Sequence, residues 1–281
     1  MLESAYPLMP FIETKVDLVV ITALSEEKKA LKDCFGIDFE RVSRDGIHYY
    51  LGSLNYGDRQ INIAAVQPVD MGPVSAAVIA ARSIVEWNPS LIVMTGICAG
   101  VKGLTRLGDL VVASQVFDHT AGTYREGLII PFQQSIRQEH WVLQFVQSVL
   151  EDEAVFDEIA ACYPMPVKTS VKPDIHVGTM ATGSFVVKDS GYVSNLLEKT
   201  SKLYGIDMES YGVASAAEIC SSALRRVTWL VIKGVVDHAD IKKTDNWHPF
   251  CAFASAKFLH TLIYQLLSRD ASYQWLKRSR E

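Results

Sequence analysis

Short apolar runs alternate with segments of helical spacing along most of this chain. The apolar runs that predict β-strands are residues 16–24, 48–54, 60–67, 90–95, 107–114, 175–180 and 228–236. The segments that predict helices are residues 25–31, 74–87, 140–158, 189–200, 209–221 and 249–267. Strands that alternate with helices are typical of a sheet covered by helices on both faces. We therefore expect a three-layer α/β/α fold around a mostly parallel mixed sheet.

Capping and turn residues refine the predicted boundaries. Ser25 is followed by acidic residues and is predicted to cap the first helix. The turn at Gly57 predicts a hairpin between the second and third strands, and Pro73 suits the first turn of the next helix. Residues 118–138 have few periodic apolar positions, so we expect a long loop that borders the functional site.

No linker, repeat or low-complexity segment divides the chain. We expect one domain over residues 16–268, preceded by an N-terminal extension at residues 1–15 and followed by a tail at residues 269–281.

Composition narrows the class of protein. A net charge of -5 in 281 residues argues against a general nucleic-acid binder, so we expect no nucleic-acid partner. The five cysteines have no CxxC pairing and lie among apolar or small residues, which indicates reduced core thiols. The first 14 residues do not have the pattern of a secretory signal, and we find no apolar run near the ~18 residues of a membrane span. We expect a cytoplasmic protein with no membrane partner.

Two carboxylates follow predicted strands or strand-like corners. Asp237 comes directly after the apolar run 228–236, and Glu209 ends the string Asp207-Met208-Glu209 before a predicted helix. Ligands of open α/β sheets bind beyond the carboxyl ends of strands, so these acids are candidates for a functional site.

These two corners resemble the nucleoside phosphorylase superfamily, specifically its hydrolytic members related to 5'-methylthioadenosine/S-adenosylhomocysteine nucleosidase. The resemblance runs from about Val16 to Ile263. It implies that Asp237 protonates the departing purine, that Glu209 accepts hydrogen bonds from the 2'- and 3'-hydroxyls of ribose, and that Met208 packs under the sugar. By itself, Glu209 is also explained as an acidic residue at a helix N-terminus.

Three further motifs carry the resemblance, and Met71 joins them as an expected substrate contact. The first is residues 23–27, whose last acid, Glu27, positions the attacking water in the related nucleosidases. The alternative is that Glu27 is only a favourable charge in the first turn of a helix.

The resemblance requires no cofactor, and no cluster of His and Cys has the spacing of a metal site, so we expect neither cofactor nor metal.

The second motif is residues 95–100, which resembles the glycine-rich turn beside the purine and ribose, with Thr95 and Gly96 as expected substrate contacts. Phosphorolytic relatives place an arginine at the end of this strand and a hydroxyl in the turn. Here those positions are Met94 and Ile97, which cannot bind a phosphate dianion. Water is therefore the expected nucleophile, with a phosphate-dependent phosphorylase as the alternative.

The third motif is residues 178–187, in which the resemblance implies that Phe185 stacks on the purine and that the backbone of Val186 binds the edge of the base. Phe185 alone could also be a core residue. Val236 departs from the family pattern, because close relatives have a serine there that helps to orient the catalytic aspartate. This departure leaves open a catalytically silent nucleotide sensor of the same fold.

The 5' side of the substrate is the open question. Residues 118–125, 136–137 and 245–250 together resemble a subgroup of nucleosidase domains of bacterial signalling and phage defence, some of which act on adenine nucleotides. Arg125, Arg137 and Lys188 are the candidate phosphate contacts, with solvated surface cations as the alternative for each.

The sequence thus predicts an enzyme that hydrolyses the N-glycosidic bond of an adenine or other purine ribonucleoside or ribonucleotide. Its partner would be that small molecule. We also expect a homodimer or a higher even-numbered assembly, with residues 118–138 near the interface, because large apolar side chains are expected at the surface. These side chains are Phe132, Trp141, Phe145 and Trp247.

Overall fold

A computed structural model describes residues 15–126, 128–132, 134–163, 173–222, 226–240, 245–269 and 274–276. Most of the expected N-terminal extension and C-terminal tail lies outside the described residues. The division of the chain into extension, domain and tail therefore stays a prediction.

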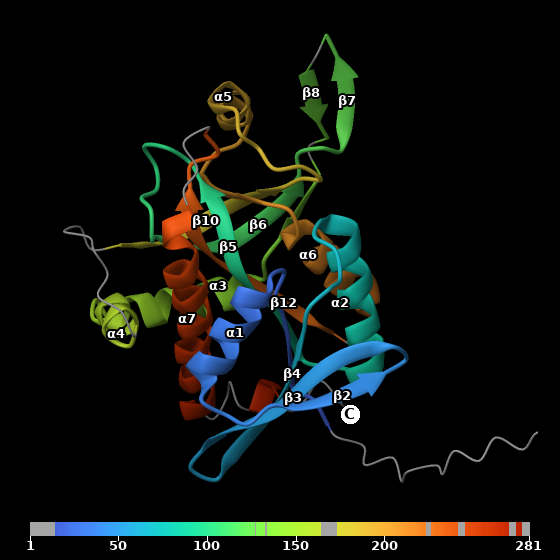
Figure 1. Cartoon of the computed structure of the whole chain (residues 1–281), viewed down its shortest axis with the longest axis vertical. Coiled ribbons are helices and arrows are strands. Elements are labelled where there is room, and N and C mark those ends of the chain that lie inside the picture. Colours follow the sequence, from blue (N-terminus) through green and yellow to red (C-terminus); the bar gives the residue numbers. More distant parts are fainter. Residues whose placement is uncertain are drawn as a thin grey trace, which may run out of the picture.

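A mixed sheet forms the centre of the described chain (Figure 1). Its strands are β1 (Leu18–Ile21), β2 (Glu40–Arg44), β3 (Ile47–Tyr56), β4 (Arg59–Val66), β5 (Leu91–Gly100), β6 (Leu110–Asp118), β9 (Ser135–Arg137), β10 (Ile175–Thr182), β11 (Leu203–Asp207) and β12 (Thr228–Asp237). Their order is β11-β10-β6-β12-β5-β1-β4-β3-β2, and β9 pairs with β6. Parallel pairings join β4, β1, β5 and β12 in one group and β6, β10 and β11 in another.

One antiparallel pairing closes part of the sheet on itself. Besides its parallel partner β10, strand β11 pairs with β5, where Gly205 lies opposite Gly100 and Ile206 lies opposite Ala99. Strands β5, β12, β6, β10 and β11 therefore form a closed ring of neighbours. This closure brings the carboxyl ends of β5, β11 and β12 to one place.

Helices cover both faces of the sheet, which confirms the expected α/β architecture (Figure 1). The helices are α1 (Ser25–Phe35), α2 (Pro73–Trp87), α3 (His140–Leu150), α4 (Val155–Ala161), α5 (Ser190–Lys199), α6 (Ser210–Cys220) and α7 (His248–Ser268), with a short 3-10 helix, η1, at Asp245–Trp247. Helices α1 and α7 pack together in one apolar core, with α3 and α4 beside them. Helices α2 and α6 pack together in the core on the opposite face.

The expectation that no apolar run approaches the length of a membrane span is wrong for helix α7. It has 21 residues and a mean hydropathy of 1.3 in its most apolar stretch, so it could cross a membrane by length and composition. However, 72% of that stretch is buried inside the protein. Its apolar side chains pack on β5 and β12, so α7 is the core helix of this fold.

The middle of the chain is more regular than the sequence indicated. Residues 118–138 are not one long loop, because β7 (Gly122–Arg125) and β8 (Leu128–Pro131) form a hairpin and β9 adds to the edge of β6. Strands this short contain too few residues for a periodic pattern, which is also why the edge strand β2 was missed. The helix predicted over residues 140–158 is two helices, α3 and α4, because Asp152 accepts the Ala154 N–H in a turn between them.

The start of α1 also differs from the prediction. Leu24 is the N-cap residue, and no side-chain cap from Ser25 forms. The carboxylate of Glu27 accepts the backbone N–H of Leu24 and takes the capping role instead.

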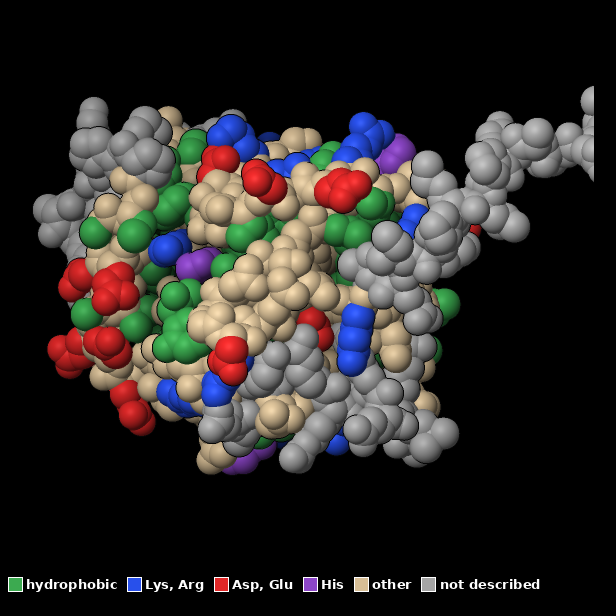
Figure 2. All heavy atoms as spheres, turned by 90° about the horizontal axis from the view of Figure 1, so that it is seen from below, with side chains coloured by type: hydrophobic (Ala, Val, Ile, Leu, Met, Phe, Trp, Pro, Cys, Tyr) green, Lys and Arg blue, Asp and Glu red, His purple; other side chains and the backbone are tan. Residues whose placement is uncertain are grey.

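Side chains at the surface are mixed in character. The face seen in Figure 2 has acidic and basic side chains interspersed with apolar ones. Trp141 and Phe145, expected at the surface, pack against the core, and so does Trp247. Only Phe132 of that set is largely exposed, at 54%. All five cysteines are free; Cys98 and Cys251 are buried as expected, whereas Cys162 is exposed.

Candidate active site

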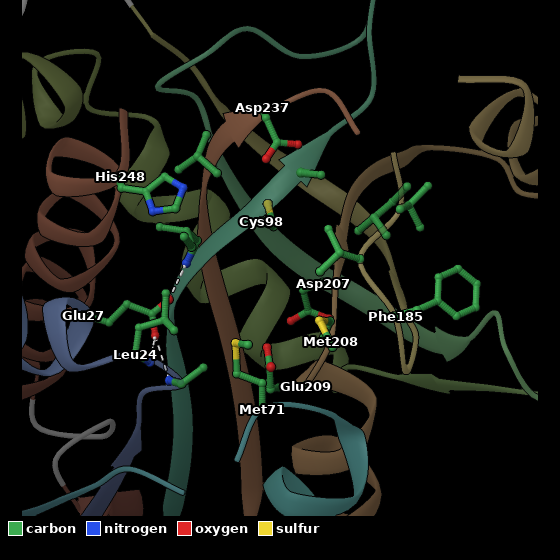
Figure 3. Close-up of a pocket in the computed structure, with 17 residues that line it drawn as sticks. Leu24, Glu27, Met71, Cys98, Phe185, Asp207, Met208, Glu209, Asp237 and His248 are labelled. Atoms are coloured by element: carbon green, nitrogen blue, oxygen red, sulfur yellow. Dashed lines mark hydrogen bonds between the residues drawn. The ribbon is translucent and has the colours of Figure 1, made fainter. Parts of the chain in front are cut away.

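A cavity of about 260 Å³ opens where β5, β11 and β12 converge (Figure 3). Its lining comes from α1, from the loop before α2, from these three strands, from the segment after β10 and from the start of α7. The lining residues are Ala23, Leu24, Glu27, Met71, Ile97, Cys98, Ala99, Phe185, Val186, Val187, Ile206, Asp207, Met208, Glu209, Val236, Asp237 and His248.

Glu27 lies at the wall of this cavity with only 2% of its surface exposed. Its Oε2 accepts the N–H groups of Ala23 at 2.7 Å and Leu24 at 2.9 Å. Its Oε1 accepts the N–H of Ile97, a residue of β5, at 3.0 Å (Figure 3). The carboxylate therefore caps α1 and also ties α1 to the glycine turn of β5, which fixes its position in the cavity wall.

Gly96 makes this arrangement possible. A Cβ atom at this position would lie 2.2 Å from Oε1 of Glu27, and the backbone φ of +154° disfavours any side chain. The space beside the glycine turn of β5 is thus filled by the carboxylate of Glu27.

Asp237 reaches the cavity through a β-bulge. The pairing of β12 with β5 shifts between Val235, opposite Cys98, and Asp237, opposite Ala99. The extra residue, Val236, bends the strand end, and such bulges re-aim side chains beside functional sites. Oδ1 of Asp237 accepts the N–H of Ala239 at 2.8 Å, so the carboxyl group is held at the end of the strand (Figure 3).

Glu209 approaches from the opposite side, at the N-terminus of α6, and is 5% exposed. Its Oε1 accepts the N–H of Gly72 at 3.1 Å, just before α2. Met208 beside it lines the cavity, and Met71 lies next to Glu209 at the lower rim (Figure 3).

Lys233, in the middle of β12, lies beneath this group of carboxylates and has no exposed surface. Its Nζ is 3.3 Å from Oδ2 of Asp207 and 3.6 Å from Oε2 of Glu209, without a hydrogen-bond partner among the described residues. Burial lowers the pKa of Lys233, but Asp207, Glu209 and Glu27 together raise it above the ordinary lysine value. Lys233 is therefore a buried cation that offsets the charge of the acids above it.

The two glutamates respond to the same environment. Burial raises the pKa of Glu27, while Lys233 and the amides of Leu24 and Ile97 lower it in part. Burial also raises the pKa of Glu209, again opposed by Lys233. The site therefore holds carboxylates whose proton affinity is higher than that of surface glutamates, a condition suited to acid–base chemistry.

Phe185, on the right of Figure 3, and Val186 form an open apolar wall of the cavity and are 42% and 51% exposed. Phe185 packs edge-on against His119, at a centroid distance of 5.4 Å, and against Tyr192, at 5.9 Å. His119 and Tyr192 are hydrogen-bonded through Nδ1 and the hydroxyl at 2.8 Å. This supports the Phe185 ring from behind and leaves it accessible to a flat ligand.

Most of the residues expected at a substrate site meet around this one cavity. Seven line it: Glu27, Met71, Phe185, Val186, Met208, Glu209 and Asp237. Thr95 is buried in β5, and Gly96 lies against Glu27, so neither is among the lining side chains. Arg125, Arg137 and Lys188 do not line the cavity either, and their proposed phosphate contacts stay predictions.

Sequence reasoning missed Lys233 and His248. Lys233 was counted within an apolar run, although a lone lysine inside a buried strand is a signal for a paired charge. His248 opens α7, and its Nδ1 lies 2.9 Å from Oε1 of Glu26. No local pattern links residues 222 positions apart, so only the fold reveals this pair.

Among the described residues, no group of three or more His, Cys, Asp or Glu side chains is arranged to hold a metal ion.

Comparison with known proteins places this chain in a family. The uncharacterized protein y4jS of Sinorhizobium fredii is 32% identical over 263 residues, covering 90% of this chain and 62% of its own length. The ATP nucleosidase Cap17 of Escherichia coli is 25% identical over 259 residues, covering 85% of this chain and 49% of its own length. The chain thus corresponds to only part of each of these relatives.

Solved structures share the fold. The S-adenosylhomocysteine nucleosidase of Streptococcus pyogenes, solved with a bound tubercidin analogue, superposes with a TM-score of 0.70 at 20% identity, covering 90% of this chain and 98% of that one. The sequence pattern of the Phosphorylase superfamily matches residues 17–265, which is most of the chain. The chain therefore belongs to the Phosphorylase superfamily.

Proposed function

We propose that this protein hydrolyses the N-glycosidic bond of a purine ribonucleoside or ribonucleotide, with adenine as the base. The observation that carries the proposal is the convergence of Glu27, Glu209 and Asp237 on one cavity with an aromatic wall at Phe185. The names of relatives agree, since Cap17 is called an ATP nucleosidase and a Buchnera aphidicola protein of 20% identity is called a 5'-methylthioadenosine/S-adenosylhomocysteine nucleosidase.

Each of these residues has a role in the proposed reaction. The purine lies against Phe185, with its N7 toward Asp237, and the ribose hydroxyls donate to Glu209. Glu27 accepts a proton from a water molecule, whose oxygen attacks C1' of the ribose. The C1'–N9 bond breaks, its electron pair leaves with the base, and Asp237 delivers a proton to N7. An acid and a base on opposite sides of the scissile bond are the arrangement of inverting glycoside hydrolases.

Hydrolysis is favoured over phosphorolysis by the same geometry. Glu27 fills the space beside Gly96, and its oxygens already accept the amides of Ala23, Leu24 and Ile97. A phosphate dianion at this point would face a buried carboxylate, whereas a neutral water molecule can donate a hydrogen bond to it.

The raised pKa of Glu27 suits a base, because a carboxylate of higher pKa accepts a proton more readily. Lys233 opposes that rise and so favours the ionised form of Glu27, the form that can accept a proton from water. Lys233 also offsets the charge of Asp207 and Glu209, which keeps the ribose-binding carboxylate in place.

The test is incubation of the purified protein with adenosine, methylthioadenosine, adenosylhomocysteine and adenosine 5'-phosphates in phosphate-free buffer, followed by chromatography for free adenine. Release of adenine and a free sugar without phosphate is the expected result. Release that requires added phosphate would replace hydrolysis by phosphorolysis. Tight binding of a nucleoside without turnover of any substrate would make the protein a nucleotide sensor.

Three further expectations belong to this proposal. We propose a homo-oligomeric enzyme, because the cavity rim at Met71, Phe185 and Val186 is exposed. A cytoplasmic location and a place in antiviral defence stay predictions.

A further inference from the structure

His248 lines the cavity on the side opposite Phe185, the side on which Glu27 and Leu24 also lie (Figure 3). Only 15% of its side chain is exposed, and its Nδ1 is engaged by Oε1 of Glu26 at 2.9 Å. A histidine bound to a carboxylate has a fixed ring orientation, so the imidazole is held at this wall of the cavity.

His248 differs in its possible charge from the other ionisable side chains that line the cavity in the described part of the chain. Glu27 and Asp207 line the cavity together with Glu209 and Asp237, so its other ionisable lining groups are acids. Lys233 lies beneath them, engaged with Asp207 and Glu209. Among the lining side chains that the structure describes, His248 is therefore the one that can carry positive charge.

Two features of its position favour an anionic ligand beside it. Glu26 from α1 engages Nδ1 and holds the ring at the cavity wall, while Glu27 from α1 and Asp237 from β12 are the acids that also line the cavity. His248 is also the first residue of the 21-residue helix α7, whose N-terminal end has partial positive charge that favours a bound anion.

The position of the ring fits one part of the substrate. With the base between Phe185 and Asp237, and the ribose hydroxyls at Glu209, the remaining ribose substituent is the 5' carbon. The cavity side left for it has Leu24 and His248 (Figure 3).

We propose that His248, held by Glu26, binds the 5'-phosphate of the substrate and makes this site select nucleoside 5'-phosphates over nucleosides with a neutral 5' group. The inference rests on the proposed hydrolase function and names the substrate class of that site. It assigns the phosphate contact to a residue of the cavity itself, unlike Arg125, Arg137 and Lys188.

The experiment measures kcat/KM for adenine release from adenosine and from adenosine 5'-monophosphate, which differ only in the phosphate. Native protein is compared with His248→Gln at one fixed pH, so that the ionisation of the substrate phosphate is the same in every assay.

We expect His248→Gln to lose at least about tenfold more kcat/KM for the nucleotide than for adenosine, the size of a charge-assisted contact. Glu26→Gln should lower the preference for the nucleotide in the same direction, because the ring loses the carboxylate that holds it. His48→Gln changes an exposed histidine on β3 and is the matched control. It should leave kcat/KM unchanged for both adenosine and the nucleotide.

Two outcomes separate this inference from the function beneath it. No adenine from any substrate would refute the proposed hydrolase. Adenine release with equal losses for nucleotide and nucleoside in His248→Gln, or with the same loss for methylthioadenosine, would overturn the inference and leave the hydrolase standing. Those results would make His248 a packing residue of the cavity wall.

Discussion

Lys233 and Asp207 form a buried ion pair under the floor of the cavity, with Nζ and Oδ2 3.3 Å apart and both side chains at most 1% exposed. Asp207 ends β11 and Lys233 lies inside β12, so the pair joins two strands of the closed ring. The same lysine lies 3.6 Å from Glu209. The buried cation thus links the scaffold of the site to Glu209, the proposed ribose-binding acid.

Loss of this cation should destabilise the protein. Lys233→Met leaves Asp207 and Glu209 without their buried counter-ion, and breaking a buried pair in this way typically costs about 3–5 kcal/mol. Thermal and urea unfolding would measure the change, with Lys233→Arg as the variant that retains the charge. A Lys233→Met protein as stable as the native one would show that Lys233 does not stabilise these acids.

The pH dependence of turnover should reveal the environment of Glu27. Burial raises its pKa above the ordinary value of 4.5, and Lys233 opposes that rise. As a base, Glu27 must be ionised, so activity should increase with pH through an apparent pKa above that of a surface glutamate. Lys233→Arg keeps the charge, so its activity should rise over the same pH range as that of the native protein. Lys233→Met should move this rise to higher pH. If activity rises over the same pH range in the native, Lys233→Arg and Lys233→Met proteins, then Glu27 or Lys233 does not have its role in the proposed mechanism.

Asp237→Asn should abolish base release while changing ligand affinity by no more than about tenfold, because the amide keeps the shape but cannot deliver a proton. Glu27→Gln should be similarly inactive, since the water would have no base. Adenine release and equilibrium binding of a nucleoside would be measured for each. Asp33→Asn, on the exposed side of α1, is the control for the loss of an acid elsewhere. Near-normal turnover in either variant would exclude that residue from catalysis.

Glu209→Ala should raise KM and lower kcat together, with a loss of about 1.5–3 kcal/mol in kcat/KM for a charge-assisted contact. The native protein should discriminate against 2'-deoxyadenosine, because one carboxylate interaction would then be unmatched. Glu218→Ala on the exposed face of α6 provides a matched control. Equal cleavage of ribose and deoxyribose substrates would contradict the ribose-clamp assignment.

Self-association should involve α2, whose exposed side chains form an apolar stripe. Val74, Val78 and Val85 are 75%, 54% and 70% exposed, and Ile219 on the adjacent α6 is 79% exposed. Apolar side chains gathered in this way generally mark interfaces. We expect a homodimer at micromolar concentration by light scattering, and a monomer for Val78→Glu. A fully active native monomer would contradict this expectation, while the proximity of residues 118–138 to the interface stays a prediction.

The sequence determined the main elements and seven of the residues that line the cavity. Long periodic segments such as α2 and α7, and apolar runs such as β5 and β12, are set by local pattern, which is why their types were predicted correctly. Asp237 and Glu209 were found because a carboxylate directly after a strand or before a helix is visible in the sequence. Glu27, Phe185 and Met208 followed from resemblance to a family.

Only the tertiary structure decided how these groups act on one another. The antiparallel pairing of β11 with β5 brings Asp207 and Glu209 over Lys233, and the bulge at Val236 re-aims Asp237. Gly96 matters because Glu27 occupies the space a side chain would need, and His248 meets Glu26 across 222 residues of chain. Burial and electrostatic coupling depend on distances in space, and sequence neighbours do not encode those distances. The contacts and electrostatic coupling between the residues of the site are therefore decided by the tertiary structure.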